Sequence, residues 1–182
     1  MTTTDQAKLA QYDFTLKFAL DRRDADPEKH MERLIASGCD DALIGIGERG
    51  RIALNFTREA ESAVQAILSA VHDVRRAIPG ATFVEATPDL VGFSDVASLL
   101  GFTRQYMRKL AEEGGPDFPL PVHEGKRAIY HLEAVLHWLM DRGRRIDMPL
   151  LETAIVNRQL NFAKEQARLK EEIPEGFKRA VA

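Results

Sequence analysis

The sequence contains little that is typical of a secreted or membrane protein. Cys39 is the single cysteine, so no disulfide can form within the chain, and we expect a small buried side chain there. No stretch approaches the ~20 consecutive apolar residues of a membrane-spanning helix. The first ten residues, MTTTDQAKLA, lack the basic segment and apolar run of a secretory signal peptide. These absences predict a cytoplasmic protein.

The chain also lacks an excess of positive charge. Its 25 Lys and Arg residues against 28 Asp and Glu residues give a formal net charge of -3. Any affinity for nucleic acid must therefore come from a local cationic patch. The hydrophobic fraction of 45% and the charged fraction of 29% are ordinary for a folded protein of one domain or two small ones.

Motifs for metal binding and catalysis are missing as well. None of the five histidines forms H-E-x-x-H, and His131 and His137 are expected on the solvated side of a helix or at its start. No G-x-S-x-G motif is present. The stretch GIGERG, Gly45 to Gly50, matches G-x-G-x-x-G, but a β-forming run follows where a dinucleotide fingerprint needs a helix. We expect no enzymatic activity, no cofactor and no metal.

The first half of the chain predicts the element order βαββαβ. Alternation from Phe14 to Leu20 predicts a half-buried strand. A short helix should begin at Asp26-Pro27 and end at Gly38. Two strands around a turn at Glu48-Arg49-Gly50 should follow, then a long helix and a last strand. The apolar period of that long helix predicts residues 58–78, with Val64, Ile67, Leu68, Val71 and Ile78 on its buried face.

This order is that of ferredoxin-like folds, so we expect a ferredoxin-like α+β domain over residues 11–87. Such a domain serves for dimerisation or for sensing a small-molecule or protein effector. RNA binding is a further alternative, which would require exposed aromatic residues on the central strands, where Phe14 and Phe56 are the candidates. The fold does not choose among these roles.

The second half predicts short helices and a hairpin. Pro88 and Asp89 mark the boundary between the halves. We expect two helices, strands over 120–123 and 127–130 that turn at 124–126, and a helix over 131–142, which together form a domain over residues 90–145. A C-terminal helix, residues 149–173, suits packing against a partner or against its own chain, and a frayed basic tail should follow.

The stretch SDVASLLGFTRQYMRKLAEEG, residues 94–114, has the features of a helix-turn-helix. Gly101 permits the positive φ of the turn, and Ala97 is small enough for two helices to cross closely. Thr103 suits the N-cap of the second helix, whose buried face should carry Met107 and Leu110. The other faces of that helix carry basic and polar side chains that could reach a DNA major groove: Arg104, Gln105, Arg108 and Lys109.

The region from Leu90 to Gly143 resembles the winged helix-turn-helix DNA-binding domains of the phage excisionase, AlpA and MerR type. The resemblance rests on the leucine pair before Gly101 and on Phe102-Thr103-Arg104. It also rests on three later motifs in the right order, which are Phe118-Pro119-Leu120-Pro121, Gly125-Lys126-Arg127 and Trp138-Leu139. His131-Leu132-Glu133 departs from relatives that often carry further arginines there, so fewer phosphate contacts are expected.

This resemblance implies a role for each basic residue. Arg104, Gln105 and Arg108 would approach bases. The phosphate contacts would come from Thr103, Lys109, Lys126 and Arg127. Tyr106 would either stack or hydrogen-bond at the groove edge or pack against the wing.

Three functions follow as hypotheses. The first is a sequence-specific regulator of transcription that binds double-stranded DNA as a homodimer and associates with the bacterial nucleoid when bound. The second is an excisionase-like architectural factor that bends DNA for a recombinase. The third is an antitoxin-like protein-interaction module whose basic helix is incidental. Tandem sites and bending would favour the second hypothesis, whereas a palindrome near a promoter would favour the first.

Overall fold

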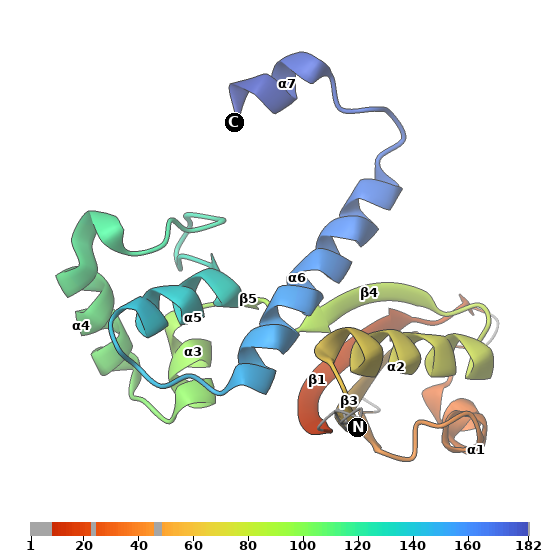
Figure 1. Cartoon of the computed structure of the whole chain (residues 1–182). Helices are drawn as coiled ribbons and strands as arrows, with labels where there is room; N and C mark the ends of the chain where they lie inside the picture. The colour runs from red at the N-terminus through yellow and green to blue at the C-terminus, as the bar shows by residue number, and fades with distance from the viewer. Residues whose placement is uncertain (1–8, 23–24, 46–48, 182) are drawn as a thin grey trace, which may run out of the picture.

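The protein has a mixed α+β fold. The computed structural model describes residues 9–22, 25–45 and 49–181. Its main sheet has the strand order β2-β3-β1-β4, and all neighbouring strands are antiparallel (Figure 1). The strands are β1 (Ala10–Ala19), β2 (Ala42–Gly45), β3 (Arg51–Ala60) and β4 (Thr82–Thr87). Residues 1–8 and residues 46–48, which include Glu48 of the predicted turn, lie outside the described residues.

One face of this sheet is covered by helices and the other carries polar side chains. Alternate β1 residues Phe14, Leu16 and Phe18 are buried, and Phe14 stacks on Phe56 with ring centroids 5.2 Å apart. After the 3-10 turn η2 (Pro27–His30), α1 (Met31–Ala36) and α2 (Ala63–Ala77) pack on this face and contribute Leu34 and Ile67, among others, to the core. The aromatic residues that an RNA-binding sheet would expose are therefore in the core.

Helix α2 corrects two expectations. It begins after the N-cap Ser62 and not at Arg58, because β3 continues to Ala60 and Arg58 pairs with Tyr12 across the sheet. Its buried face combines Ile67 and Val71, as predicted, with small residues such as Ala66 and Ala70. Val64 and Leu68, which the apolar period places in the core, are 48% and 43% exposed.

The second half, residues 90–145, is called here the helical half, and residues 9–87 the sheet half. The helical half has its own core, in which Val96, Met107 and Leu136 are fully buried. Its elements are β5 (Leu90–Val91), α3 (Phe93–Leu100), α4 (Arg104–Gly114), η3 (Gly115–Asp117), β6 (Tyr130–His131) and α5 (Leu132–Asp141). A two-stranded sheet pairs β5 with β6.

Helix α6 (Met148–Arg168) connects the two halves (Figure 1). Its first turns bury Leu151 and Ala154 in the helical half, whereas Val156 and Leu160 pack against the core of the sheet half. A hydrogen bond of 2.7 Å from the Tyr12 hydroxyl to Glu152 adds a polar contact. The predicted C-terminal helix thus exists and packs against its own chain, but it ends at Arg168 and not at residue 173. A short helix α7 (Glu175–Ala180) follows where a frayed tail was expected.

Side chains of α6 also cover the outer edge of β4. Asn161 bonds both the N–H and the carbonyl of Ala86, each at 2.8 Å. Lys164 and Arg168 donate to the carbonyls of Val84 and Phe83. Because unpaired backbone groups make an exposed edge prone to pairing with other strands, these contacts close that edge of the sheet. Among the described residues, no helix is both long enough and apolar enough to cross a membrane.

Candidate nucleic-acid interface

The turn between α3 and α4 has the backbone that its sequence predicts. Gly101 adopts a left-handed conformation with φ of 68° and ends α3. Thr103 caps α4, and its hydroxyl accepts a hydrogen bond of 3.1 Å from the N–H of Tyr106. Ala97 and Met107 are buried where the two helices pack. The capping and crossing chemistry therefore fixes α4 against α3.

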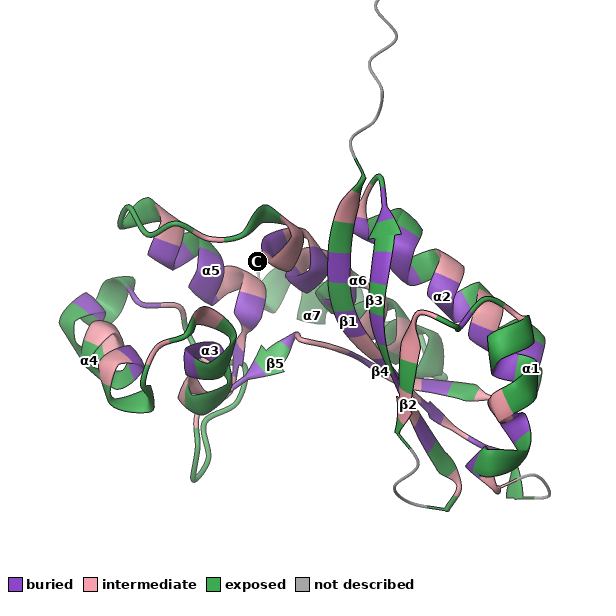
Figure 2. Cartoon of the chain, turned by 90° about the horizontal axis from the view of Figure 1, so that it is seen from below, coloured by how far each residue is buried: buried purple, intermediate pink, exposed green. Residues whose placement is uncertain are grey.

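Helix α4 presents its polar faces to solvent. It lies at the end of the molecule away from the main sheet in both views (Figures 1 and 2), and neither the sheet half nor α6 covers it. Of the eight predicted site residues, Tyr106 is half-buried. The side chains of the other seven are exposed: Thr103, Arg104, Gln105, Arg108, Lys109, Lys126 and Arg127.

Four of the predicted basic residues line one hollow. This hollow, of about 310 Å³, is lined by Arg104 and Arg108 from α4 and by Lys126 and Arg127 from the loop before β6. We call it the basic hollow. Asp95 also lines it, and its carboxylate accepts a hydrogen bond of 2.8 Å from the Gly92 N–H. The fold thus brings residues from two segments to one surface that carries an excess of positive charge.

Two of the cations on α4 are partly compensated. Nε of Arg108 lies 2.8 Å from a Glu112 carboxylate oxygen, and Nζ of Lys109 lies 3.6 Å from Glu113. Both pairs span one helical turn and all four side chains are exposed, so solvent screens them and they are easily exchanged for phosphate contacts. Arg104 and Gln105 have no charged partner among the described residues.

The structure corrects the expected wing. Strands over 120–123 and 127–130 were predicted, but this segment has a single bridge between His123 and Ile129. Residues 130 and 131 instead form β6 and pair with β5. Pro119 and Pro121 lack the N–H that a ladder needs, which shortens the hairpin. Lys126 and Arg127 are exposed on the resulting loop, which we call the wing loop, residues 119–129.

Tyr106 packs within the helical half, next to the loop that follows α5. Its ring packs edge-on against Phe102 with centroids 5.2 Å apart. Its hydroxyl accepts a hydrogen bond from Arg144, whose guanidinium lies 5.8 Å from the same ring. Tyr106 therefore attaches the loop after α5 to α4.

Sequence reasoning missed this second group of cations. Arg144 and Arg145 are exposed beside α4, and Arg142 lies over Trp138 at 4.0 Å from the ring centroid. The run Arg142-Gly143-Arg144-Arg145 is visible in the sequence as a local cluster of charge. Its proximity to Tyr106 depends on the tertiary fold and could not be deduced from spacing.

Other candidate sites are weaker. Cys39 is buried, and burial together with the negative charge of Asp73 raises the pKa of its thiol to about 11, so it is a poor nucleophile. β3 begins at Arg51, which puts a strand directly after the G-x-G-x-x-G stretch, whose residues 46–48 lie outside the described residues. No group of potential ligands suited to a metal ion occurs in the described ranges.

His131 lies at the start of α5 as its N-cap residue, which is one of the two positions expected for it. Its side chain is only 25% exposed, and its Nδ1 lies 2.7 Å from Asp89, a carboxylate that is 2% exposed. Asp89, which marks the predicted boundary between the halves, is buried between them where β5, β6 and α6 meet. This pair is separate from the cationic surface of α4.

Comparison of the chain with protein-family models, curated proteins and solved structures finds no match.

Proposed function

We propose that this protein is a sequence-specific, double-stranded DNA-binding regulator of transcription that uses a winged helix-turn-helix. The observation that carries the proposal is the basic hollow, where Arg104 and Arg108 of α4 meet Lys126 and Arg127 of the wing loop on an open surface. In Figure 2, α4 lies at the end of the molecule away from the main sheet, which supports access of a duplex to this surface.

The proposed division of labour follows from the positions of the side chains. Arg104, Gln105 and Arg108 lie on the first turns of a helix narrow enough to enter a major groove, where arginine recognises guanine with two hydrogen bonds. Thr103, Lys109 and the wing-loop cations contact phosphates and set the register of the helix. The positive end of the α4 dipole adds to this attraction.

The remainder of the chain is proposed to serve assembly. The strand order and element order of the sheet half support a ferredoxin-like domain, which with the winged helix-turn-helix and α6 completes the proposed fold. A single module with few phosphate contacts gains affinity by binding paired half-sites, so we propose a homodimer. Since most of α6 packs within the chain, its exposed C-terminal end near Leu169 remains for a partner.

Selection of binding sequences from a random duplex pool, followed by salt-titrated fluorescence anisotropy, tests this function. Arg104→Ala should lower affinity for the selected sequence by about 1–3 kcal/mol and relax its preference at one position. Lys126→Ala should weaken binding to selected and unrelated duplexes alike, and should reduce the slope of log K against log salt by about 1. The two variants thus separate base contacts from phosphate contacts.

Arg75→Ala is the matched control, because Arg75 is an exposed arginine of α2 in the sheet half and its loss changes net charge equally. It should leave both duplex affinities unchanged. The proposal is wrong if the pool yields no enriched sequence, or if Arg75→Ala weakens binding as much as Arg104→Ala and Lys126→Ala do.

A further inference from the structure

A large hollow lies at the junction of the two halves, away from the proposed DNA surface. It measures about 780 Å³, and its walls come from β4, β5, the wing loop, the start of α5 and α6. Leu90, Val122 and Phe162 give it apolar surface, while Asp89 and His131 form a polar part of the wall. We call it the junction hollow. Its volume is within the range of about 300–1,000 Å³ that is common for small-molecule sites.

A buried carboxylate, that of Asp89, holds the polar part of the wall in place. Asp89 Oδ1 lies 2.7 Å from His131 Nδ1, and Asp89 Oδ2 accepts a hydrogen bond of 2.8 Å from Asn161. Because an ionised carboxylate accepts hydrogen bonds and cannot donate them, we assign the ring proton of His131 to Nδ1. In the neutral ring, Nε2 is then a hydrogen-bond acceptor. Nε2 has no partner among the described residues, and the His131 side chain is 25% exposed.

The charged side chains of the junction hollow already have partners. Glu133 lies 2.9 Å from Arg158, and Glu85 lies 2.8 Å from Lys17. Lys164 is 2.5 Å from Glu165 and donates to the Val84 carbonyl. A charged ligand would have to displace one of these partners, so the hollow favours an uncharged molecule.

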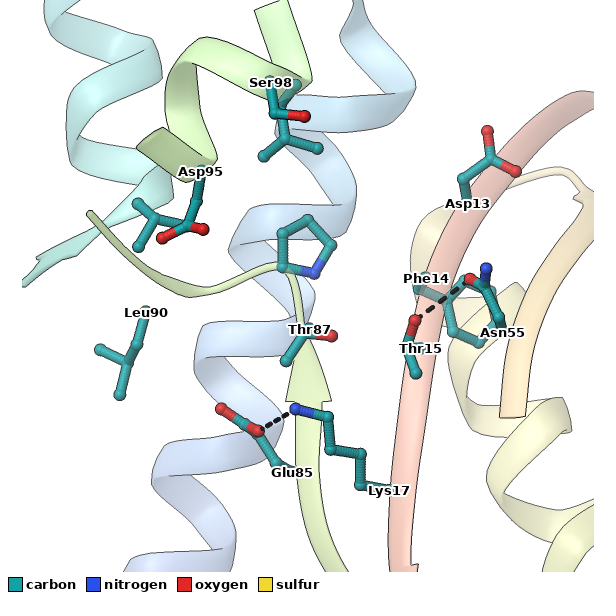
Figure 3. A pocket seen from close by; sticks show the side chains of 13 residues that line it. Asp13, Phe14, Thr15, Lys17, Asn55, Glu85, Thr87, Leu90, Asp95 and Ser98 are labelled. Carbon is teal, nitrogen blue, oxygen red and sulfur yellow. Dashed lines mark hydrogen bonds and ion pairs between the residues drawn. The ribbon is translucent and has the colours of Figure 1, made fainter. Parts of the chain in front are cut away.

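A second hollow, of about 500 Å³, makes a useful contrast. It lies between α3 and the polar face of the sheet (Figure 3), where Lys17 reaches Glu85 and Thr15 bonds to Asn55 at 3.1 Å. These side chains form hydrogen bonds and ion pairs with one another, and none of them is oriented by a buried carboxylate in the way that Asp89 orients His131. The junction hollow therefore offers the better defined acceptor.

We propose that the junction hollow binds an uncharged aromatic molecule that carries a hydroxyl or N–H donor. The donor bonds to Nε2 of His131, and the ring packs against Leu90, Val122 and Phe162. This site is distinct from the basic hollow, and its test uses no DNA, so its failure leaves the proposed function untouched.

A matched pair of probes tests the acceptor. Isothermal titration of the full chain with 2-naphthol should show one saturable site, whereas 2-methoxynaphthalene, which has no donor, should bind about fivefold more weakly. His131→Asn keeps an amide donor for Asp89 but removes Nε2, so it should bind both probes equally. His137→Asn, at an exposed histidine of α5, is the control and should preserve the difference.

A second variant tests the apolar wall. Phe162→Ser should weaken both probes, whereas Phe177→Ser should weaken neither, because Phe177 is equally exposed at 67% but lies on α7 outside the hollow. Equal binding of the two probes to the unaltered chain, or unsaturable binding, would overturn the proposal. So would a finding that Phe162→Ser leaves probe binding intact and instead reduces self-association in sedimentation, which would make the surface an interface between copies.

Discussion

Arg58 in the sheet half and Arg104 in the helical half carry the same charge in opposite surroundings. Arg58 is 9% exposed and bonds to Asp41, Asp73, Ser69 and the Gly38 carbonyl. Arg104 is exposed and has no charged partner among the described residues. A buried guanidinium needs all of its donors satisfied, whereas an exposed one remains available for a ligand. Charge therefore stabilises the fold in the sheet half, whereas in the helical half it stays available for the proposed recognition of DNA.

The pKa of Arg58 reflects this role. Burial acts to lower it, but hydrogen bonds and negative charge from Asp41 and Asp73 outweigh burial, and the pKa lies above its ordinary value. Arg58 therefore stays charged and ties the turn after α1 to α2.

Removal of Arg58 should have the largest effect. Arg58→Met should lower the free energy of unfolding by about 3–5 kcal/mol, because it leaves two carboxylates without their buried partner. Arg76→Met is the control, since Arg76 pairs with the same Asp73 from the surface, and it should cost no more than about 1 kcal/mol. Urea denaturation measures both. Similar losses of unfolding free energy in the two variants would mean that the buried and the exposed arginine contribute equally to stability.

The thiol of Cys39 provides a second comparison of buried with exposed chemistry. Its pKa of about 11 should make the folded thiolate population about a hundredfold smaller than that of an exposed thiol at pH values below both pKa values. The folded state holds this proton more tightly, so the stabilisation is complete below the ordinary thiol pKa and is lost as pH rises toward 11. Alkylation of the Cys39 thiol should be slow in the folded chain and fast in urea. Equal alkylation rates would contradict the burial of this thiol.

Close packing in the helical half is tested by Gly114. A Cβ added there would lie 2.6 Å from Cζ2 of Trp138, so Gly114→Ala should destabilise the protein by about 1–3 kcal/mol. Gly176→Ala in α7 meets no atom within 4 Å and should be neutral or slightly stabilising. Thermal unfolding compares the two variants, and an unchanged melting temperature for Gly114→Ala would show that α4 and α5 separate easily.

The smallest effect is expected at the exposed ion pair of α4. Glu112→Gln should cost no more than about 0.5 kcal/mol of stability, because the pair is solvated and one turn apart. It should also raise DNA affinity slightly, since it removes a negative charge and leaves Arg108 without a competitor for phosphate. Anisotropy at low salt measures this gain. A loss of affinity would mean that Glu112 orients Arg108 for its DNA contact.

Local backbone chemistry made part of this structure predictable. Gly101 at positive φ and Thr103 as an N-cap depend on neighbouring residues alone, so the ends of α3 and α4 could be inferred from the sequence. The alternation of Phe14, Leu16 and Phe18 identified β1 for the same reason. These signals lie within a few residues of the feature that they specify.

The rest depended on contacts between distant segments. The apolar period places Arg58 at the start of a helix. The partners that bond to Arg58 in the fold, Asp41 and Asp73, lie 17 and 15 residues away in the sequence and give no local signal. The pairing of His131 with Asp89 spans 42 residues, and that of Arg144 with Tyr106 spans 38. The periodicity of a sequence carries no information about contacts between distant segments. The basic residues of α4 could therefore be named from the sequence, whereas the contact of Arg144 with Tyr106 could not.

A titration of the isotopically labelled chain with its selected duplex, followed by amide chemical shifts, tests the central claim most directly. The largest shifts should fall on residues 103–109 of α4, on Lys126 and Arg127, and on Arg144, while the amide shifts on the polar face of the sheet should stay unchanged. Shifts confined to the sheet half, with those amides of α4 unaffected at saturation, would contradict it.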